Sequence, residues 1–267
     1  MRQTLSSLAI VLVALGAAAC GSREPVRPDV ILILSDDLSY RIGLYGHPAQ
    51  TPSLDTLAGR GRRFDRAYCQ FPVCNPSRTS LFTGWRPERT AVWGNRRNPA
   101  PYVRDAVPLQ EHFERNGYFT ARVGKVYHSR FEDEFRWSHV YDTYSGTGLA
   151  GETEFRWGPS RVPEEKLPDA RAAREVVELL DTPREQPLFI AMGLLKPHAP
   201  WVAPERYFQL YPPESVELAP SASEPSRGPG GGIPRARWRE ALAAYRASVT
   251  FADAQVGRVL EALDLSL

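Results

Sequence analysis

The hydrophobic positions of the chain form short unbroken runs separated by longer helical stripes. Val30–Leu34 and Pro187–Met192 are apolar without alternation, a pattern typical of strands covered on both faces, as in a parallel sheet. Tyr118–Val123 also predicts a strand. Polar residues follow each run. We therefore expect three strands whose ends carry polar side chains.

Helix signals lie between the predicted strands. A proline or a capping residue followed by periodic apolar positions marks most starts, and glycine marks several ends. The last helix carries its apolar residues along one face. The first expected helix begins at Pro52 and ends at Gly59 or Gly61. The other four cover residues 75–84, 108–116, 169–180 and 235–263.

The alternation of strands and helices predicts an α/β fold with a mostly parallel sheet flanked by helices. Two segments interrupt this pattern. Residues 129–166 mix aromatic, glycine and polar positions, and we expect a long surface excursion there. Residues 220–234 are rich in Ser, Pro and Gly, which favours a flexible loop.

Composition and charge exclude several classes of protein. Of the 267 residues, 42% are hydrophobic and 24% charged, which is typical of a folded protein and excludes a disordered chain or a small disulfide-dense scaffold. Lys and Arg number 33 against 31 Asp and Glu, for a net charge of +2, and charges of one sign form no long run. We therefore expect no nucleic-acid partner.

The N-terminus has the pattern of a targeting segment. Arg2 is followed by the apolar stretch Leu8–Leu15 and then by small residues up to Ala19, which predicts a signal peptide over residues 1–19 and an exported protein. Cys20 follows three alanines, as at a bacterial lipoprotein cleavage site, and lipid on Cys20 would attach the protein to a membrane. Simple cleavage after Ala19 would instead leave a soluble periplasmic or secreted protein.

Ionisable residues follow all three predicted strands. Asp36–Asp37 come after the first, Lys125 with His128 after the second, and Lys196 with His198 after the third. Ligands of such sheets gather beyond the carboxyl ends of the strands, so these side chains are expected to share one site. Cations beside imidazoles favour anion binding and proton transfer there. Taken singly, each pair also fits a solvated lysine beside a hydrogen-bonded loop histidine.

The adjacent carboxylates of Asp36 and Asp37 have two interpretations. At the end of a buried strand they repel each other and lose solvent, so a bound divalent cation would stabilise both. An all-oxygen site favours Ca²⁺ or Mg²⁺ over zinc. Alternatively, the pair caps the turn that follows the strand.

Cys74 precedes a helix start, Asn75–Pro76–Ser77, and lies four residues before Arg78. The helix dipole and the guanidinium favour an activated thiolate or a nucleophile that faces an anion. The alternative is a structural cysteine, because Cys69 is close enough in sequence to form a disulfide in an oxidising compartment.

The order and spacing of these motifs resemble the formylglycine-dependent sulfatases of the alkaline phosphatase superfamily. The resemblance runs from Pro28 to the end of the chain, and several of its segments are most similar to iduronate-2-sulfatases and their bacterial relatives. The residues that carry it are Asp36–Asp37, Thr51–Ala58, Cys74–Gly84, Gly117–Thr120, Gly124–His128, Lys196–His198, Tyr245–Val249 and Asp253–Gly257.

This resemblance implies a mechanism. A formylglycine-generating enzyme would convert Cys74 to an aldehyde, and one hydroxyl of the aldehyde hydrate would attack sulfur. Asp36, Asp37 and residue 74 would bind Ca²⁺, which polarises the sulfate. The family's remaining roles fall on basic residues: Arg78 and Lys125 would hold the hydrate, Lys125, Lys196 and His198 would contact the substrate, His198 would protonate the leaving alcohol, and His128 would accept the proton of the second hydroxyl.

The resemblance also implies a substrate class and a domain boundary. Sulfated carbohydrate is expected, such as 2-O-sulfated uronic acid of glycosaminoglycans. The family has further metal ligands after the long helix, so residues 28–267 are interpreted as the N-terminal part of a truncated catalytic domain. The alternatives are a non-catalytic remnant that binds anionic glycans at the cell surface, a choline or aryl sulfatase, and a phosphatase or phosphonate hydrolase of the same superfamily.

Overall fold

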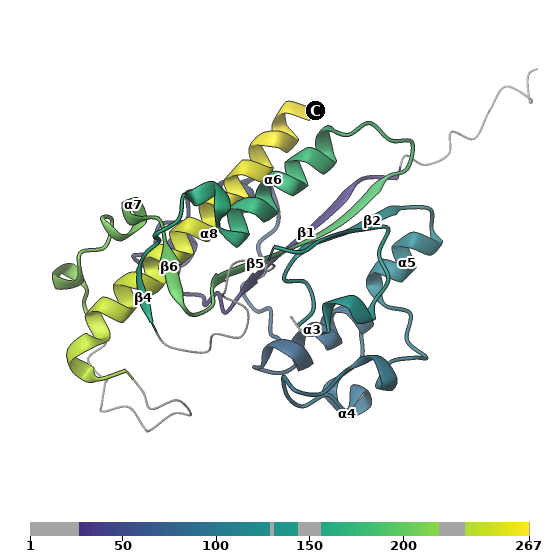
Figure 1. The fold of residues 1–267 in the computed structure, drawn as a ribbon, viewed down its shortest axis with the longest axis horizontal. Helices are drawn as coiled ribbons and strands as arrows, with labels where there is room; N and C mark the ends of the chain where they lie inside the picture. The colour runs from purple at the N-terminus through teal and green to yellow at the C-terminus, as the bar shows by residue number, and fades with distance from the viewer. Residues whose placement is uncertain (1–26, 129–130, 144–155, 219–232, 267) are drawn as a thin grey trace, which may run out of the picture.

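A computed structural model describes residues 27–128, 131–143, 156–218 and 233–266 (Figure 1). Four parallel strands form the main sheet in the order β1-β5-β2-β3. Their bounds are Val30–Asp36 for β1, Leu188–Pro197 for β5, Phe119–Gly124 for β2 and His139–Tyr141 for β3. The predicted α/β fold with a parallel sheet is therefore confirmed.

The burial of each strand follows its place in the sheet. β5 lies between β1 and β2, and all ten of its residues are buried. It continues to Pro197, five residues beyond the end of the predicted strand. β1 lies at an edge of the described sheet and is half-buried up to Ser35, less than its unbroken apolar run predicts. A strand with one partner strand keeps more contact with solvent than a central one.

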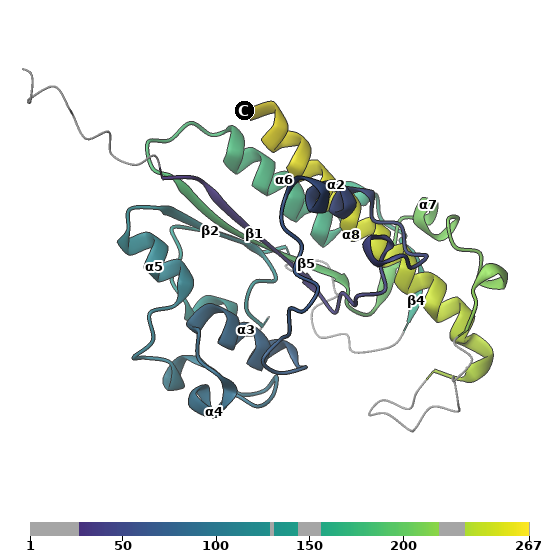
Figure 2. The ribbon, with the colours of Figure 1, turned by 180° about the vertical axis from the view of Figure 1, so that it is seen from behind.

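Helices cover both faces of the sheet (Figures 1 and 2). α6, Pro168–Asp181, and α8, Trp238–Ser266, lie side by side on one face, and α3, Cys74–Thr83, and α5, Leu109–Arg115, lie on the other. Alternate residues of β5 supply the two cores, as the period of a strand requires. Ile190 and Met192 pack beneath α6 and α8, whereas Phe189 stacks on Phe113 of α5 with ring centroids 4.1 Å apart.

The predicted helices are confirmed with small shifts at their ends. Gly61 follows the end of α2, Pro52–Arg60, and Gly84 ends α3 in a left-handed conformation. The long helix begins at Trp238, after a short turn of 3-10 helix. Among the described residues, no helix combines the length and the hydrophobicity that a membrane span requires. The short elements are η1 Gly43–Tyr45, α4 Pro87–Thr90, η2 Ala100–Tyr102, η3 Glu132–Glu134, η4 Glu164–Lys166, α7 Glu205–Phe208, η5 Pro213–Ser215 and η6 Arg235–Arg237.

The expectation of a surface excursion over residues 129–166 is wrong for part of that segment. It supplies β3 to the main sheet and buries Trp137 against the core, because its aromatic residues pack on Phe82 and Phe189. It also supplies β4, Trp157–Pro159, which pairs in parallel with β6, Trp201–Ala203. The predicted signal peptide, Cys20 and nearly all of the predicted loop at 220–234 lie outside the described residues.

Candidate active site

The carboxyl ends of β1 and β5 meet at an irregularity in their pairing. Ser35 pairs with Leu194, but the next residue, Asp36, pairs with Pro197, so two residues of β5 bulge out. The buried Asp169 at the start of α6 accepts hydrogen bonds from the amide groups of both bulged residues, at 2.7 and 2.9 Å. This irregularity places His198 beside Asp36–Asp37.

A glycine in β5, Gly193, lets the residue that follows β2 come close to the backbone of β5. Lys125 donates its amide hydrogen to the Gly193 carbonyl oxygen at 2.9 Å. A Cβ atom on Gly193 would lie 1.8 Å from the Lys125 carbonyl oxygen, so no other residue fits at this position. Neither Asp169 nor Gly193 was predicted from the sequence to support the site. A glycine inside an apolar strand run was the available signal for the latter.

Asp36 is the centre of a buried charge network. Its carboxylate accepts a hydrogen bond from the Arg78 guanidinium at 3.0 Å and contacts the Lys125 ammonium. Arg78 also donates to the carbonyl oxygens of Lys125 and Val126, at 2.7 and 2.8 Å. Burial alone would raise the pKa of Asp36, but the two cations outweigh burial and lower that pKa to about 2. Asp36 is therefore ionised at neutral pH.

Asp37 lies at the mouth of the site. Its backbone has a left-handed φ of 63°, and its side chain is 57% exposed. The Asp37 Oδ2 atom is 3.8 Å from Nε2 of His198, whose Nδ1 lies 2.5 Å from the Ala199 carbonyl oxygen. Partial loss of solvent and repulsion by Asp36 raise the pKa of Asp37. The two adjacent carboxylates thus differ in environment, as one is neutralised and the other faces the opening.

Cys74 is the first residue of α3 and faces this diacid. Burial and the neighbouring Asp36 carboxylate raise the pKa of its thiol to about 11. The expected activated thiolate is therefore wrong, because the nearby carboxylate and the loss of solvent favour the protonated form. Cys69 is exposed and both thiols are free, so the alternative disulfide is not formed in the structure.

Two basic residues predicted for the site are placed differently. Lys196 is buried, and its ammonium donates to the carbonyl oxygens of Pro200 and His198, so it braces its own loop. Burial lowers the pKa of Lys196 to about 8. His128 is half-buried, with its ring centroid 6.4 Å from that of Phe131. Neither residue is among those that line the cavity at Cys74.

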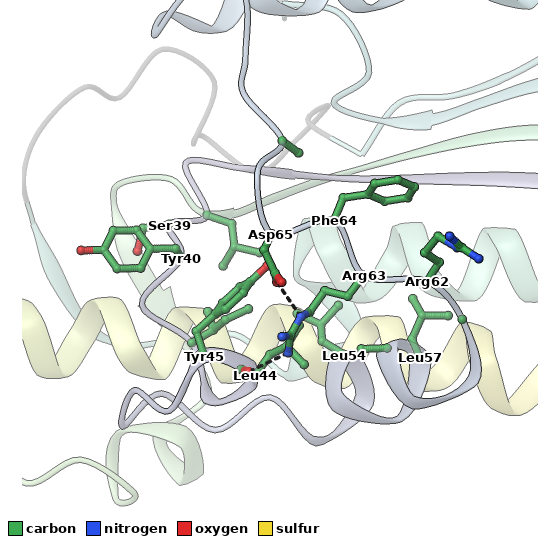
Figure 3. A pocket seen from close by; sticks show the side chains of 15 residues that line it. Ser39, Tyr40, Leu44, Tyr45, Leu54, Leu57, Arg62, Arg63, Phe64 and Asp65 are labelled. Atoms are coloured by element: carbon green, nitrogen blue, oxygen red, sulfur yellow. Dashed lines mark hydrogen bonds and ion pairs between the residues drawn. The ribbon is translucent and has the colours of Figure 1, made fainter.

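The cavity above Cys74 has a volume of about 580 Å³. Charged, polar and apolar groups all line it. A larger cavity of about 830 Å³ is shown in Figure 3, and Leu38 lines both cavities. That second lining is mainly apolar, and its Asp65 pairs with Arg63 at 2.6 Å. The chemistry is therefore concentrated in the smaller cavity, which is lined by Leu34–Leu38, Cys69, Phe71–Cys74, Ser77, Arg78, Leu81, Asn95 and His198.

The carboxylate oxygens of Asp36 and Asp37 suit a hard divalent cation, whereas the Cys74 sulfur and the His198 nitrogen are softer donors. Ligand atoms of Asp36, Cys74 and His198 all lie within 4.8 Å of one another, and Asp37 adds a second carboxylate. Calcium takes about six to eight oxygen ligands. An oxygen in place of the Cys74 sulfur would improve the fit, and further oxygen ligands are needed to complete the shell.

Comparisons with known proteins identify the family of the chain. The sequence model of the family described as Sulfatase matches residues 28–266. The chain belongs to the sulfatase family. A sulfatase of Formosa agariphila is 31% identical to this sulfatase chain over 90% of the chain and 56% of the relative. Human iduronate 2-sulfatase is 31% identical, over 96% of the chain and 55% of its own length.

The solved structures show the same fold. A phosphonate monoester hydrolase of Agrobacterium radiobacter matches with a TM-score of 0.70 at 20% identity, covering 90% of the sulfatase chain and 60% of the hydrolase. The chain spans about half the length of the curated relatives that it matches. The resemblance inferred from the motifs is therefore confirmed at the level of family and fold.

Proposed function

We propose that the protein containing this chain hydrolyses sulfate esters of carbohydrates. The observation that carries the proposal is the position of Cys74 at the start of α3, in a cavity that also presents Asp36, Arg78 and His198. A thiol whose pKa is raised to about 11 is a poor nucleophile at neutral pH, which favours a converted residue over an unmodified cysteine.

Conversion of Cys74 to formylglycine would supply a hydrated aldehyde, whose hydroxyl is the nucleophile for sulfur. Asp36 and Asp37 would hold a Ca²⁺ ion, which supplies charge stabilisation for the sulfate. Arg78 and Lys125 keep Asp36 ionised and add positive charge beside the reacting group. These two cations therefore serve both the metal ligand and the anionic substrate.

His198 is the proposed acid for the leaving alcohol. It lines the cavity and its Nε2 faces Asp37 at 3.8 Å, so a proton on this nitrogen points to the open side of the site. His128 is proposed to accept the proton of the second hydroxyl when sulfate leaves. Because His128 does not line the cavity, the proton has to reach it from the hydroxyl through the wall of the site. Lys196 is proposed to act near the substrate through the loop that it braces.

We further propose 2-O-sulfated uronic acid of glycosaminoglycans as the substrate, supported by 31% identity to human iduronate 2-sulfatase over 96% of the chain. A formylglycine-generating enzyme would act during maturation. Export to the periplasm or attachment to the cell envelope through lipid on Cys20 is supported by the apolar N-terminal stretch of the sequence.

The test is co-expression of the full-length protein with a formylglycine-generating enzyme. Mass spectrometry of the peptide containing residue 74 should show the aldehyde, and sulfate should be released from an aryl sulfate and from a sulfated uronate. Cys74→Ser should abolish release, while Thr56→Ser, a control at an exposed position of α2 outside the cavity, should retain it. An unmodified thiol without release would refute the proposal, and faster cleavage of a matched phosphate ester would favour a phosphatase.

A further inference from the structure

The turn that follows β1 determines where the Asp37 carboxylate lies. Asp37 has a φ of 63°, a conformation that residues other than glycine rarely adopt. The next residue, Leu38, lines both the cavity at Cys74 and the larger apolar cavity beside it, where Figure 3 also shows Ser39. The turn thus borders both cavities, and its unfavourable backbone conformation needs support from another element.

A tyrosine of α8 supplies this support. The Tyr245 hydroxyl donates to the Asp37 carbonyl oxygen at 3.0 Å and accepts a hydrogen bond from the Ser39 amide at 2.9 Å. A phenolic hydroxyl can donate and accept at the same time, so one group closes the turn from both sides. The support comes from a helix that is remote in sequence and packs on the central strand β5.

The same tyrosine is linked to the loop that carries His198. Its ring meets the ring of Trp201 edge-on, with centroids 6.0 Å apart, and the Trp201 indole donates to the Pro197 carbonyl oxygen at 2.9 Å. Tyr245 therefore contacts the backbone of the Asp37 turn and also Trp201, which supports the loop of His198. Asp37 Oδ2 and His198 Nε2, which these two loops carry, are 3.8 Å apart.

We propose that Tyr245 is a positioning residue, which holds the Asp37 carboxylate at the mouth of the catalytic cavity and opposite His198. It acts through the backbone of the turn and does not touch the reacting atoms. The catalytic consequence rests on the proposed function, whereas the support of the turn can be measured without it. Calcium affinity and turnover should both depend on the Tyr245 hydroxyl, because Asp37 is a proposed ligand of the ion.

The test compares Tyr245→Phe with Tyr211→Phe in the full-length protein. The Tyr211 hydroxyl also accepts from a backbone amide, that of Gln50 at 2.8 Å, and contacts Thr250 of the same helix at 2.6 Å. Loss of this hydroxyl removes one hydrogen bond from a backbone amide and one to α8, without touching the Asp37 turn. Each variant is examined by amide hydrogen exchange at Ser39, by calorimetric titration with calcium chloride, and by kcat and KM for sulfate release.

In Tyr245→Phe the Ser39 amide hydrogen should exchange at least tenfold faster than in the wild type. Calcium should bind about 10- to 100-fold more weakly. The substitution should lower kcat by a larger factor than it raises KM. Tyr211→Phe should match the wild type in all three. Equal Ser39 exchange in the wild type and Tyr245→Phe would overturn the proposal, as would equal losses in the two variants. Absence of sulfate release from the wild type would sink the proposed function alone, since Ser39 exchange still reports on the turn.

Discussion

Arg78 donates one hydrogen bond to the Asp36 carboxylate and two to the backbone carbonyl oxygens that follow β2. One guanidinium thus joins the ends of β1 and β2 and also neutralises a buried carboxylate. A lysine could not reproduce this fork, because its single ammonium has no planar array of donors. The integrity of the site should therefore depend on this side chain.

Replacement of Arg78 by alanine should lower the free energy of unfolding by about 3 kcal/mol, because it leaves a buried carboxylate with one cation and two carbonyl groups without their donor. Arg60→Ala is the matched control, as it removes another Arg–Asp pair whose side chains are 56% and 47% exposed. That variant should lose far less stability, because an ion pair in solvent contributes little. Urea denaturation measures both, and equal losses would contradict the argument.

The stability of the metal-free protein should depend on pH through Asp36. Its pKa is about 2 in the folded protein and 3.8 without its partners, so its contribution is fully present above about pH 4 and is lost as the pH falls toward 2. The difference of nearly two units corresponds to about 2 kcal/mol. In chelator, the stability gap between the wild type and Asp36→Asn should shrink by this amount between pH 6 and pH 2. A gap that does not change with pH would show that the Asp36 pKa is not lowered.

The α/β fold could be predicted because its signals are local. The unbroken apolar runs at Val30 and Leu188 and the glycine after α3 depend on neighbours in the sequence, and the structure confirms each. The convergence of Asp36 and His198 followed from one further rule, that parallel strands end at the same edge of the sheet.

The parts that could not be predicted depend on contacts that are remote in sequence. The irregular pairing after Ser35 has no local pattern, and neither has the hydrogen bond of the Lys196 ammonium to the Pro200 carbonyl oxygen. The thiol of Cys74 was expected to ionise from its place at a helix start, but burial and then the Asp36 carboxylate, which comes from β1, raise its pKa. β3 was missed because three residues carry too short a pattern.

Asp169→Asn should disturb the loop of His198. Each carboxylate oxygen of Asp169 accepts one backbone amide of the β5 bulge, and asparagine offers only one acceptor oxygen. One buried amide would then face an NH₂ group, which costs about 1 to 3 kcal/mol. Thermal unfolding should show this loss, and sulfate release by the full-length protein should fall with it. Asp181→Asn, at the exposed end of the same helix, should leave both unchanged; a loss of similar size there would indicate a general effect on α6.

Gly193→Ala should be far more damaging than its single added methyl group suggests. The new Cβ would lie 1.8 Å from the Lys125 carbonyl oxygen, and this obstacle is backbone that cannot move aside without separating β5 from β2. We expect a loss of about 3 kcal/mol or more, or failure to fold. Gly59→Ala is the matched control: its Cβ meets nothing within 4 Å on α2, and the better helix propensity of alanine should stabilise the protein by about 0.5 to 1 kcal/mol. Chemical denaturation should thus give effects of opposite sign for the same substitution, and a tolerated Gly193→Ala would show that the two strand ends do not approach as closely as described.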